Sequence, residues 1–318
     1  MSATMAMTFM KITYGQFLLL CLCMPIAGLA LLLLRDQLKK PTHERLKTHW
    51  RGRTPWVMLA VLIVVAMVYT APWDNHLIAQ GVWWYDPALV SGVTLGRIPV
   101  EELLFFPLQT ILIGLWILWL IPRVPSSPLG AAGAGQERTS TGEESNVRKV
   151  DKATRVYKQI VLTTRVRLAE ASTIRWFAAI VSASAMLWLV GFVILLRGWR
   201  PGTYLGWELV WALPPLLLQL GLGGDLLWRR RRLILIAFVP AVLYLSTADA
   251  LAIHEGIWTI SPHLSLGLLL GGVLPLEEFF FFLLTSALVT GGLVLGEAVE
   301  PRVDSRLHTL RQTRAMRL

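Results

Sequence analysis

Two stretches of this sequence place adjacent glutamates among otherwise apolar residues. Residues 98–107 read IPVEELLFFP and residues 273–282 read VLPLEEFFFF, so the pair Glu101 and Glu102 recurs as Glu277 and Glu278. An ionised side chain at the centre of a membrane costs roughly 2.5–3.5 kcal/mol on insertion scales. Burial therefore favours the neutral carboxylic acid, and a second carboxyl nearby favours it further. A protonated carboxyl in an apolar cavity is a proton donor.

Aspartates and aromatic residues accompany both glutamate pairs. They are Asp74, Tyr69, Trp83, Phe105 and Phe106 in the first half, and Asp249, Tyr244, Trp258, Phe281 and Phe282 in the second. Aromatic faces stabilise a cation within about 6 Å of the ring. These groups together predict a reaction in which an acid protonates an alkene, π-faces hold the carbocation and a carboxylate removes a proton. That chemistry requires no metal or cofactor, and the sequence offers no His, Cys and Asp set with convincing metal-ligand spacing.

The two glutamates of a pair cannot share one role, because neighbouring residues of a helix point about 100° apart. We expect one to face a substrate cavity and the other to bond to an adjoining helix or to the aspartate of its own half. A structural alternative is that the carboxyls cap membrane helices, since Pro99 and Pro275 suit the first turn of a helix. The aromatic residues could equally form a belt at the membrane interface.

Composition places the chain in a membrane. Of its 318 residues, 55% are hydrophobic and only 16% are charged, and the mean hydropathy is +0.57. Apolar runs near the roughly 20 residues that cross a bilayer predict seven spans, at residues 14–34, 56–74, 100–121, 176–197, 204–222, 233–252 and 274–296. The second run is short unless its helix continues through Pro72 to Gln80. The predicted fold class is an all-α integral membrane protein with about seven transmembrane helices.

The sequence also contains an internal repeat. Five positions of residues 69–87 recur without a gap at residues 244–262: Tyr69, Asp74, Gly81, Trp83 and Pro87 match Tyr244, Asp249, Gly256, Trp258 and Pro262. One inserted residue then aligns the prolines and glutamate pairs, and upstream the segments TYGQFLLLCLCMP and TYLGWELVWALPP begin alike. The unit is three helices, and an odd number of crossings would invert the second copy. The span at 176–197 therefore acts as a connector that makes the two repeats parallel.

These features divide the chain and orient it. We predict a first repeat at residues 1–122, a flexible linker at 123–175, a connector helix at 176–200, a second repeat at 201–297 and a basic tail at 298–318. Of the 30 Lys and Arg residues, 26 lie in the four segments 35–53, 123–175, 229–232 and 298–318. The positive-inside rule makes these segments cytoplasmic and puts the N-terminus outside. The net charge of +10 thus indicates topology, not nucleic-acid binding.

The duplicated Pro-x-Glu-Glu-x-x-x-Phe pattern, PVEELLFF and PLEEFFFF, resembles the carotenoid cyclases of the heterodimer type in their fused, single-chain form. The resemblance implies cofactor-free cyclisation of the ψ-end groups of lycopene to rings, with β-rings expected, in a bacterial cell membrane and alongside other carotenoid-pathway enzymes. It implies that one glutamate pair supplies the acid, and that a carboxylate of the other pair or an aspartate takes the final proton. One departure from repeat symmetry is Glu208, which aligns with Leu18.

Several alternatives follow from the same residues. The family also includes cyclases of C50 carotenoids, which leaves the substrate open. A proton-coupled transporter would use intramembrane carboxylates in a repeat, although these spans carry few Asn, Gln or Arg. A carotenoid-binding protein without catalysis would tolerate Glu to Gln changes. A retinal protein is excluded, because all seven lysines lie outside the predicted spans and no Schiff base can form within them.

Overall fold

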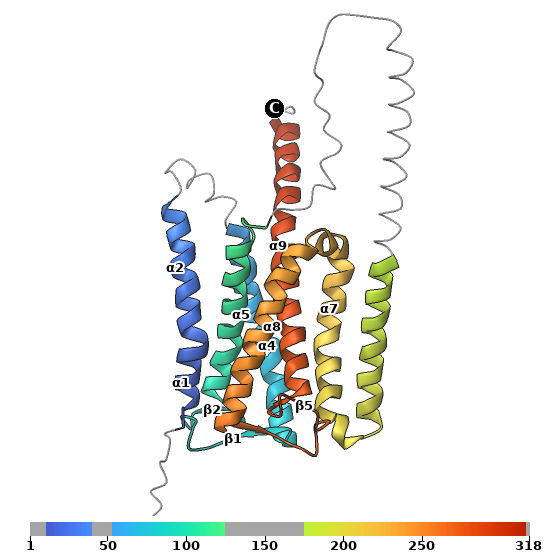
Figure 1. The fold of residues 1–318 in the computed structure, drawn as a ribbon. Coiled ribbons are helices and arrows are strands. Elements are labelled where there is room, and N and C mark those ends of the chain that lie inside the picture. The colour runs from blue at the N-terminus through green and yellow to red at the C-terminus, as the bar shows by residue number, and fades with distance from the viewer. Residues whose placement is uncertain (1–10, 40–52, 125–174, 316–318) are drawn as a thin grey trace, which may run out of the picture.

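The computed structural model describes residues 11–39, 53–124 and 175–315. Within these ranges seven helices are long and apolar enough to cross a membrane, which confirms the predicted all-α membrane fold. The first three spans are α1 (Tyr14–Leu18) with η1 (Leu19–Cys23) and α2 (Met24–Leu38), then α4 (Arg53–Gln80) and α5 (Val100–Leu120). After the span at Arg175–Leu196 come η3 (Arg200–Gly202) with α7 (Thr203–Arg229), α8 (Arg231–Glu255) and α9 (Leu276–Ala315). These helices run side by side in one bundle (Figure 1).

Some helices run further than hydropathy predicts. The second span continues through Pro72 to Gln80, and α8 reaches Glu255. Both end where a glycine adopts a left-handed conformation, Gly81 with φ 75° and Gly256 with φ 76°. In each case the N–H of the next residue donates to a carbonyl five positions back, a common helix-ending arrangement. The predicted linker lies almost wholly outside the described residues, and α9 makes the backbone helical over most of the predicted tail.

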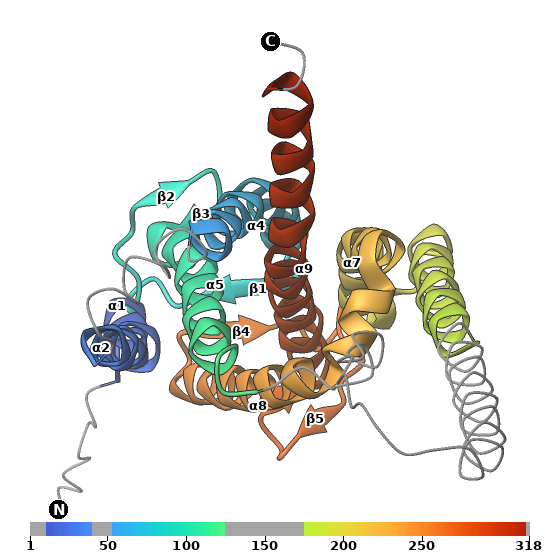
Figure 2. The same ribbon diagram turned by 90° about the horizontal axis from the view of Figure 1, so that it is seen from above.

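Four helices form the inside of the bundle. α4 packs on α5 and α9, and α8 packs on the same two helices. α2 lies outside against α5, and α7 lies outside against α9, as seen from above in Figure 2. The helix at 175–196 packs on the outer side of α7, where Gly191 and Gly206 allow close approach: a Cβ at Gly191 would lie 2.8 Å from the Leu209 Cβ.

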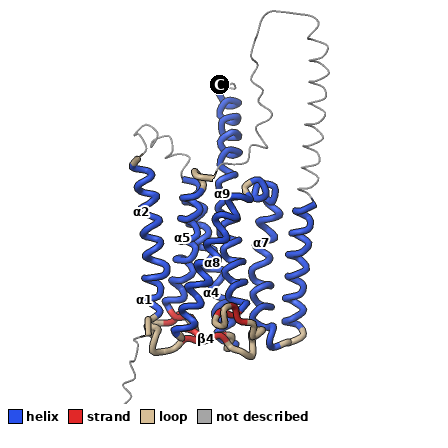
Figure 3. The backbone as a smooth tube through the Cα atoms, in the orientation of Figure 1, coloured by secondary structure: helices blue, strands red, loops and turns tan. Residues whose placement is uncertain are grey.

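The described part of the chain contains six short strands, which gather at one end of the bundle (Figure 3). They are β1 (Trp83–Tyr85), β2 (Thr94–Leu95), β3 (Ile98–Pro99), β4 (Trp258–Ile260), β5 (Leu269–Leu270) and β6 (Leu274–Pro275). β1 pairs antiparallel with β4, with Trp84 opposite Thr259. These two residues are equivalent in the sequence repeat, so a pseudo-twofold axis passes between them. The repeats are thus related by rotation about an axis along the bundle.

The loops explain the one-residue insertion in the repeat. β2 pairs with β3 and β5 pairs with β6 in two equivalent hairpins. Two residues, Gly96 and Arg97, connect the first hairpin, whereas three, Gly271 to Val273, connect the second. The extra residue is absorbed in a turn, so the prolines and glutamates that follow begin α5 and α9 at equivalent places. The repeat therefore positions both motifs at the same end of the bundle.

Candidate active site

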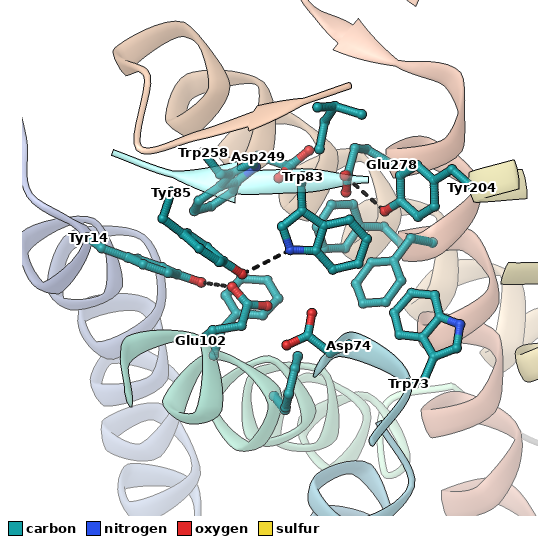
Figure 4. A pocket seen from close by; sticks show the side chains of 15 residues that line it. Tyr14, Trp73, Asp74, Trp83, Tyr85, Glu102, Tyr204, Asp249, Trp258 and Glu278 are labelled. Carbon is teal, nitrogen blue, oxygen red and sulfur yellow. Dashed lines mark hydrogen bonds between the residues drawn. The ribbon is translucent and has the colours of Figure 1, made fainter. Parts of the chain in front are cut away.

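A cavity of about 40 Å³ lies between the two repeats, beside the paired strands β1 and β4 (Figure 4). Four of the six predicted catalytic carboxyls line it: Asp74, Glu102, Asp249 and Glu278. Six of the eight predicted aromatic residues line it as well: Trp83, Phe105, Phe106, Trp258, Phe281 and Phe282. Residues far apart in the chain, such as Asp74 on α4 and Glu278 on α9, thus meet at one place.

Tyrosines hold the second glutamate of each pair. The Tyr14 hydroxyl donates a hydrogen bond to Glu102, and the Tyr204 hydroxyl donates to Glu278 over 2.9 Å. Both tyrosines are buried and line the cavity. They occupy the same position in the repeat, one at the start of each copy's first helix. Neither tyrosine was in the predicted site, although the shared letters TY at the start of the aligned segments were the signal for them.

The first glutamate of each pair points elsewhere. The backbone N–H of Ser91 donates to Glu101 and that of Leu266 donates to Glu277, each over 2.6 Å. Both N–H groups belong to the loop that precedes a hairpin, so these carboxylates tie that loop to the start of α5 or α9. We expected the outward glutamate to bond to an adjoining helix or to an aspartate. The structure shows that the partner is instead the backbone of a loop.

The two aspartates lie deep in the site. Asp74 on α4 is 1% exposed and Asp249 on α8 is 3% exposed. In each, the Oδ2 atom has no hydrogen-bond partner among the described residues. A buried polar atom without a partner costs about 1–3 kcal/mol and calls for an explanation. Here both atoms belong to side chains that line the cavity, so a ligand bound there is the candidate partner.

Aromatic rings form one wall of the cavity. Trp73 stacks on Phe281 with centroids 6.0 Å apart and an interplanar angle of 6°, and it also lies 5.9 Å from Trp83. Trp83 in turn lies 5.3 Å from Tyr204. Trp73 was not predicted, because its equivalent in the repeat is Ala248 and the comparison of the two halves does not select it.

Tyr69 and Tyr244, which we predicted to bind substrate, lie outside the cavity. The Tyr69 hydroxyl donates to the Trp211 carbonyl over 2.8 Å, and the Tyr244 hydroxyl donates to the Cys21 carbonyl over 2.7 Å. Each tyrosine thus bridges to the first helix of the other repeat. Both side chains point from α4 and α8 toward outer helices, where Tyr69 and Tyr244 each line a groove separate from the cavity.

The two sides of the cavity are chemically different. Tyr85 stands in the first half where Ile260 stands in the second, and both line the cavity. Tyr85 accepts a hydrogen bond from the Trp83 indole over 3.1 Å and lies beside Glu102. Burial, together with the nearby Glu102 and Asp74 carboxylates, raises the pKa of Tyr85 well above its usual value near 10. Tyr85 is therefore a neutral phenol at physiological pH.

Glu208 adds a further carboxyl to the second half. It is 0% exposed, and neither of its oxygens has a hydrogen-bond partner among the described residues. It lies one helical turn from Tyr204 on α7, near the Glu277 and Glu278 carboxylates.

We predict that Glu208→Leu raises the free energy of unfolding by about 1–3 kcal/mol, because it removes a buried polar group without a partner. Thermal unfolding in detergent measures this. Leu18 shows that leucine fits the equivalent position, and a destabilised variant would contradict the prediction.

Comparison of the chain with known proteins identifies its family. The lycopene cyclase family model matches residues 15–120 and 201–293, the segments that carry both repeats. A lycopene beta-cyclase of Halobacterium salinarum is 34% identical over 247 residues, which cover 77% of this chain and 85% of the relative.

A bifunctional lycopene cyclase/phytoene synthase of Podospora anserina is 31% identical over 248 residues, covering 76% of this chain but 35% of the relative. That of Neurospora crassa is 33% identical over 247 residues. No solved structure matches this chain. These matches confirm the resemblance inferred from the duplicated glutamate motif: the chain belongs to the lycopene cyclase family.

Proposed function

We propose that this protein is a lycopene cyclase that converts the ψ-end groups of lycopene to β-rings. The observation that carries the proposal is one aromatic-walled cavity lined by four carboxyls from both repeats, of which Asp74, Asp249 and Glu278 are buried. The family and the similarity to a lycopene beta-cyclase support the same substrate and ring type. The reaction is an isomerisation, so product and substrate have equal mass.

The proposed chemistry begins with proton transfer from a glutamic acid, Glu102 or Glu278, to C2 of the end group. The C1–C2 double bond breaks and leaves a cation at C1. The C5–C6 double bond then attacks C1, which forms the C1–C6 bond and moves the cation to C5. Loss of the proton on C6 restores a C5–C6 double bond and gives the β-ring. The Oδ2 atoms of Asp74 and Asp249, without partners among the described residues, make these carboxylates the proposed acceptors of that proton.

The side chains that line the cavity stabilise the cation. The faces of Trp73, Trp83 and Phe281 supply π-electron density at centroid separations of 5.9–6.0 Å from one ring to the next. Carboxylates that remain ionised balance the developing positive charge, and they do so strongly because the cavity is shielded from solvent. The hydrogen bonds from Tyr14 and Tyr204 fix the two glutamates in position. No cofactor is needed for this sequence of steps.

We further propose that the strand-bearing end of the bundle faces outward and that the C-terminus is cytoplasmic. The helix ends that flank the basic segments, Leu38, Arg53, Leu120, Arg175 and Arg229, all lie at the opposite end (Figure 1). Positively charged loops are retained on the cytoplasmic side of a membrane. The proposed division into two repeats, a linker and a connector helix agrees with this arrangement.

The direct test is expression of the chain in bacteria engineered to accumulate lycopene, followed by chromatography and mass analysis of the pigments. We expect cyclised pigments of unchanged mass that carry β-rings. Unchanged lycopene, with the protein shown to be inserted in the membrane, would refute the proposal. A strain that supplies a C50 carotenoid, and a proton-flux assay in vesicles, would then identify a C50 cyclase or a transporter.

A further inference from the structure

We propose that the polyene chain of the substrate lies in a bilayer-facing groove between α4, α5, α7 and α9 while its end group occupies the cavity. The inference rests on the proposed function and assigns a second part of the substrate site. The groove has a volume of about 110 Å³, and its walls include Leu62, Val65 and Ala66 of α4 and Leu288 and Val289 of α9. A carotenoid is far longer than the cavity, so its remaining carbons need a path outward.

The groove adjoins the cavity. Phe106 and Phe281 line both spaces, so these two side chains form part of the wall between them. The cavity volume of about 40 Å³ suffices for a few water molecules. An end group that holds a whole six-membered ring with its methyl groups needs more room, and the space can grow only where a wall moves. Rotation of the two phenylalanine rings would join cavity and groove into one elongated site.

The chemistry of the groove fits a hydrocarbon. Most of its polar groups are bonded to protein: the Gln109 amide donates to the Thr285 hydroxyl over 2.8 Å, and the Thr110 hydroxyl donates to the Phe106 carbonyl over 2.9 Å. The Gln219 amide donates to the Leu288 carbonyl over 2.8 Å, while its Oε1 has no partner among the described residues. The surface that the groove presents to a ligand is mostly aliphatic and aromatic. At the outer rim Val65 is 49% exposed on a membrane-spanning helix, so the groove opens to lipid. A polyene dissolved in the bilayer can enter from there.

The repeat supplies a counterpart groove that we do not assign to the substrate. It lies between α2, α5 and α8, around Ala241 and Tyr244, which are equivalent to Ala66 and Tyr69. At about 310 Å³ it is larger, yet among the described residues it shares no lining side chain with the cavity. We weigh adjacency above size, because only a groove next to the cavity can hold the rest of a molecule whose end reacts in the cavity. One entrance implies that the two ends of lycopene react one after the other.

The two equivalent alanines allow a matched test. Ala66→Trp fills the proposed groove, and Ala241→Trp fills its counterpart; both alanines are half-buried. With purified protein in lycopene-containing vesicles, we expect Ala66→Trp to lower kcat/KM at least about tenfold and Ala241→Trp to change it less than about twofold, because a displaced substrate misaligns the reacting carbons. Ala66→Leu should have an intermediate effect if the tryptophan variant folds poorly. Equal effects of the two tryptophan variants, or a loss only in Ala241→Trp, would overturn the proposal.

A binding measurement separates this inference from the proposed function. Lycopene retained by protein purified from the lycopene strain is measured by visible absorbance, in a Glu278→Gln background that blocks turnover. Ala66→Trp should remove the retained lycopene, and Ala241→Trp should not. If the wild-type protein failed to cyclise lycopene but this retention pattern held, the proposed function would be refuted and the groove assignment would be retained. Unchanged lycopene retention in Ala66→Trp, with loss of a bound phospholipid by native mass spectrometry, would overturn the groove assignment in favour of lipid.

Discussion

Replacing Glu102 or Glu278 with glutamine is expected to reduce lycopene cyclisation by roughly 10²–10⁴-fold, the usual contribution of a positioned acid or base. Glutamine keeps the shape of the side chain and can still accept the hydrogen bond from Tyr14 or Tyr204. It cannot donate an acidic proton, and it cannot carry a negative charge to balance the cation. The rate of ring formation by purified protein, measured against the amount of folded protein, tests this expectation.

The first glutamate of each pair provides the control. In Glu101→Gln and Glu277→Gln the amide carbonyl still accepts the N–H of Ser91 or Leu266, so the loop remains attached to its helix. We therefore expect both variants to keep wild-type activity to within about threefold, with a small loss of stability because a charged acceptor makes the stronger hydrogen bond. Equal losses in all four variants would show that the pairs act as structural units and would contradict our assignment of roles.

The products of the Glu102 and Glu278 variants carry further information. A single cavity is lined by carboxyls from both repeats, so each end group meets the same set of residues. Either substitution should then slow both cyclisations and leave lycopene, with little one-ring pigment. If each repeat processed one end of the substrate on its own, each variant would accumulate a one-ring product. Chromatography of the pigments decides between the two.

Much of this site was predictable, because the two repeats can be aligned with each other and the positions that they share can be selected. Glu102, Asp74, Trp83 and Phe105 were selected by having an equivalent in the second half, and the structure places each of them in the cavity. The same comparison also selected Tyr69, whose equivalent Tyr244 has an equivalent structural role on the outside of the inner helices. Repetition identifies residues under a common constraint, and it does not distinguish a reactive group from a bridge between helices.

The groups that were missed break the symmetry of the repeat or need tertiary contacts to interpret. Trp73 and Tyr85 line the cavity but have Ala248 and Ile260 as counterparts, so a comparison of the two halves does not select them. The partner of Glu101 is a backbone N–H ten residues earlier, which depends on the path of a loop and not on side-chain type. Helix ends depended on glycine conformation at Gly81 and Gly256 and not on hydropathy.

Asp74→Asn and Asp249→Asn are expected to have the second large effect, a loss of roughly 10²-fold in β-ring formation, because asparagine cannot accept the final proton. The two aspartates enter the cavity from α4 and α8, on opposite sides of the pseudo-twofold axis, and each presents an oxygen without a partner among the described residues. Asparagine is nearly the same size, so packing is retained. Asp86→Asn is the control, because its side chain accepts the Ala88 N–H from outside the cavity and asparagine can do the same.

The product distinguishes loss of a proton acceptor from loss of structure. When deprotonation slows, the C5 cation persists, and water in the cavity can add to it with release of a proton. The resulting alcohol has a mass one water greater than lycopene and carries the new ring, so it is expected as a minor pigment in the impaired aspartate variant. A variant that merely unfolds would yield lycopene alone and a lower unfolding temperature. Wild-type rates in both aspartate variants would instead assign the final proton to a glutamate, and the oxygens without partners at Asp74 and Asp249 would then mark charge balance for the cation and not proton removal.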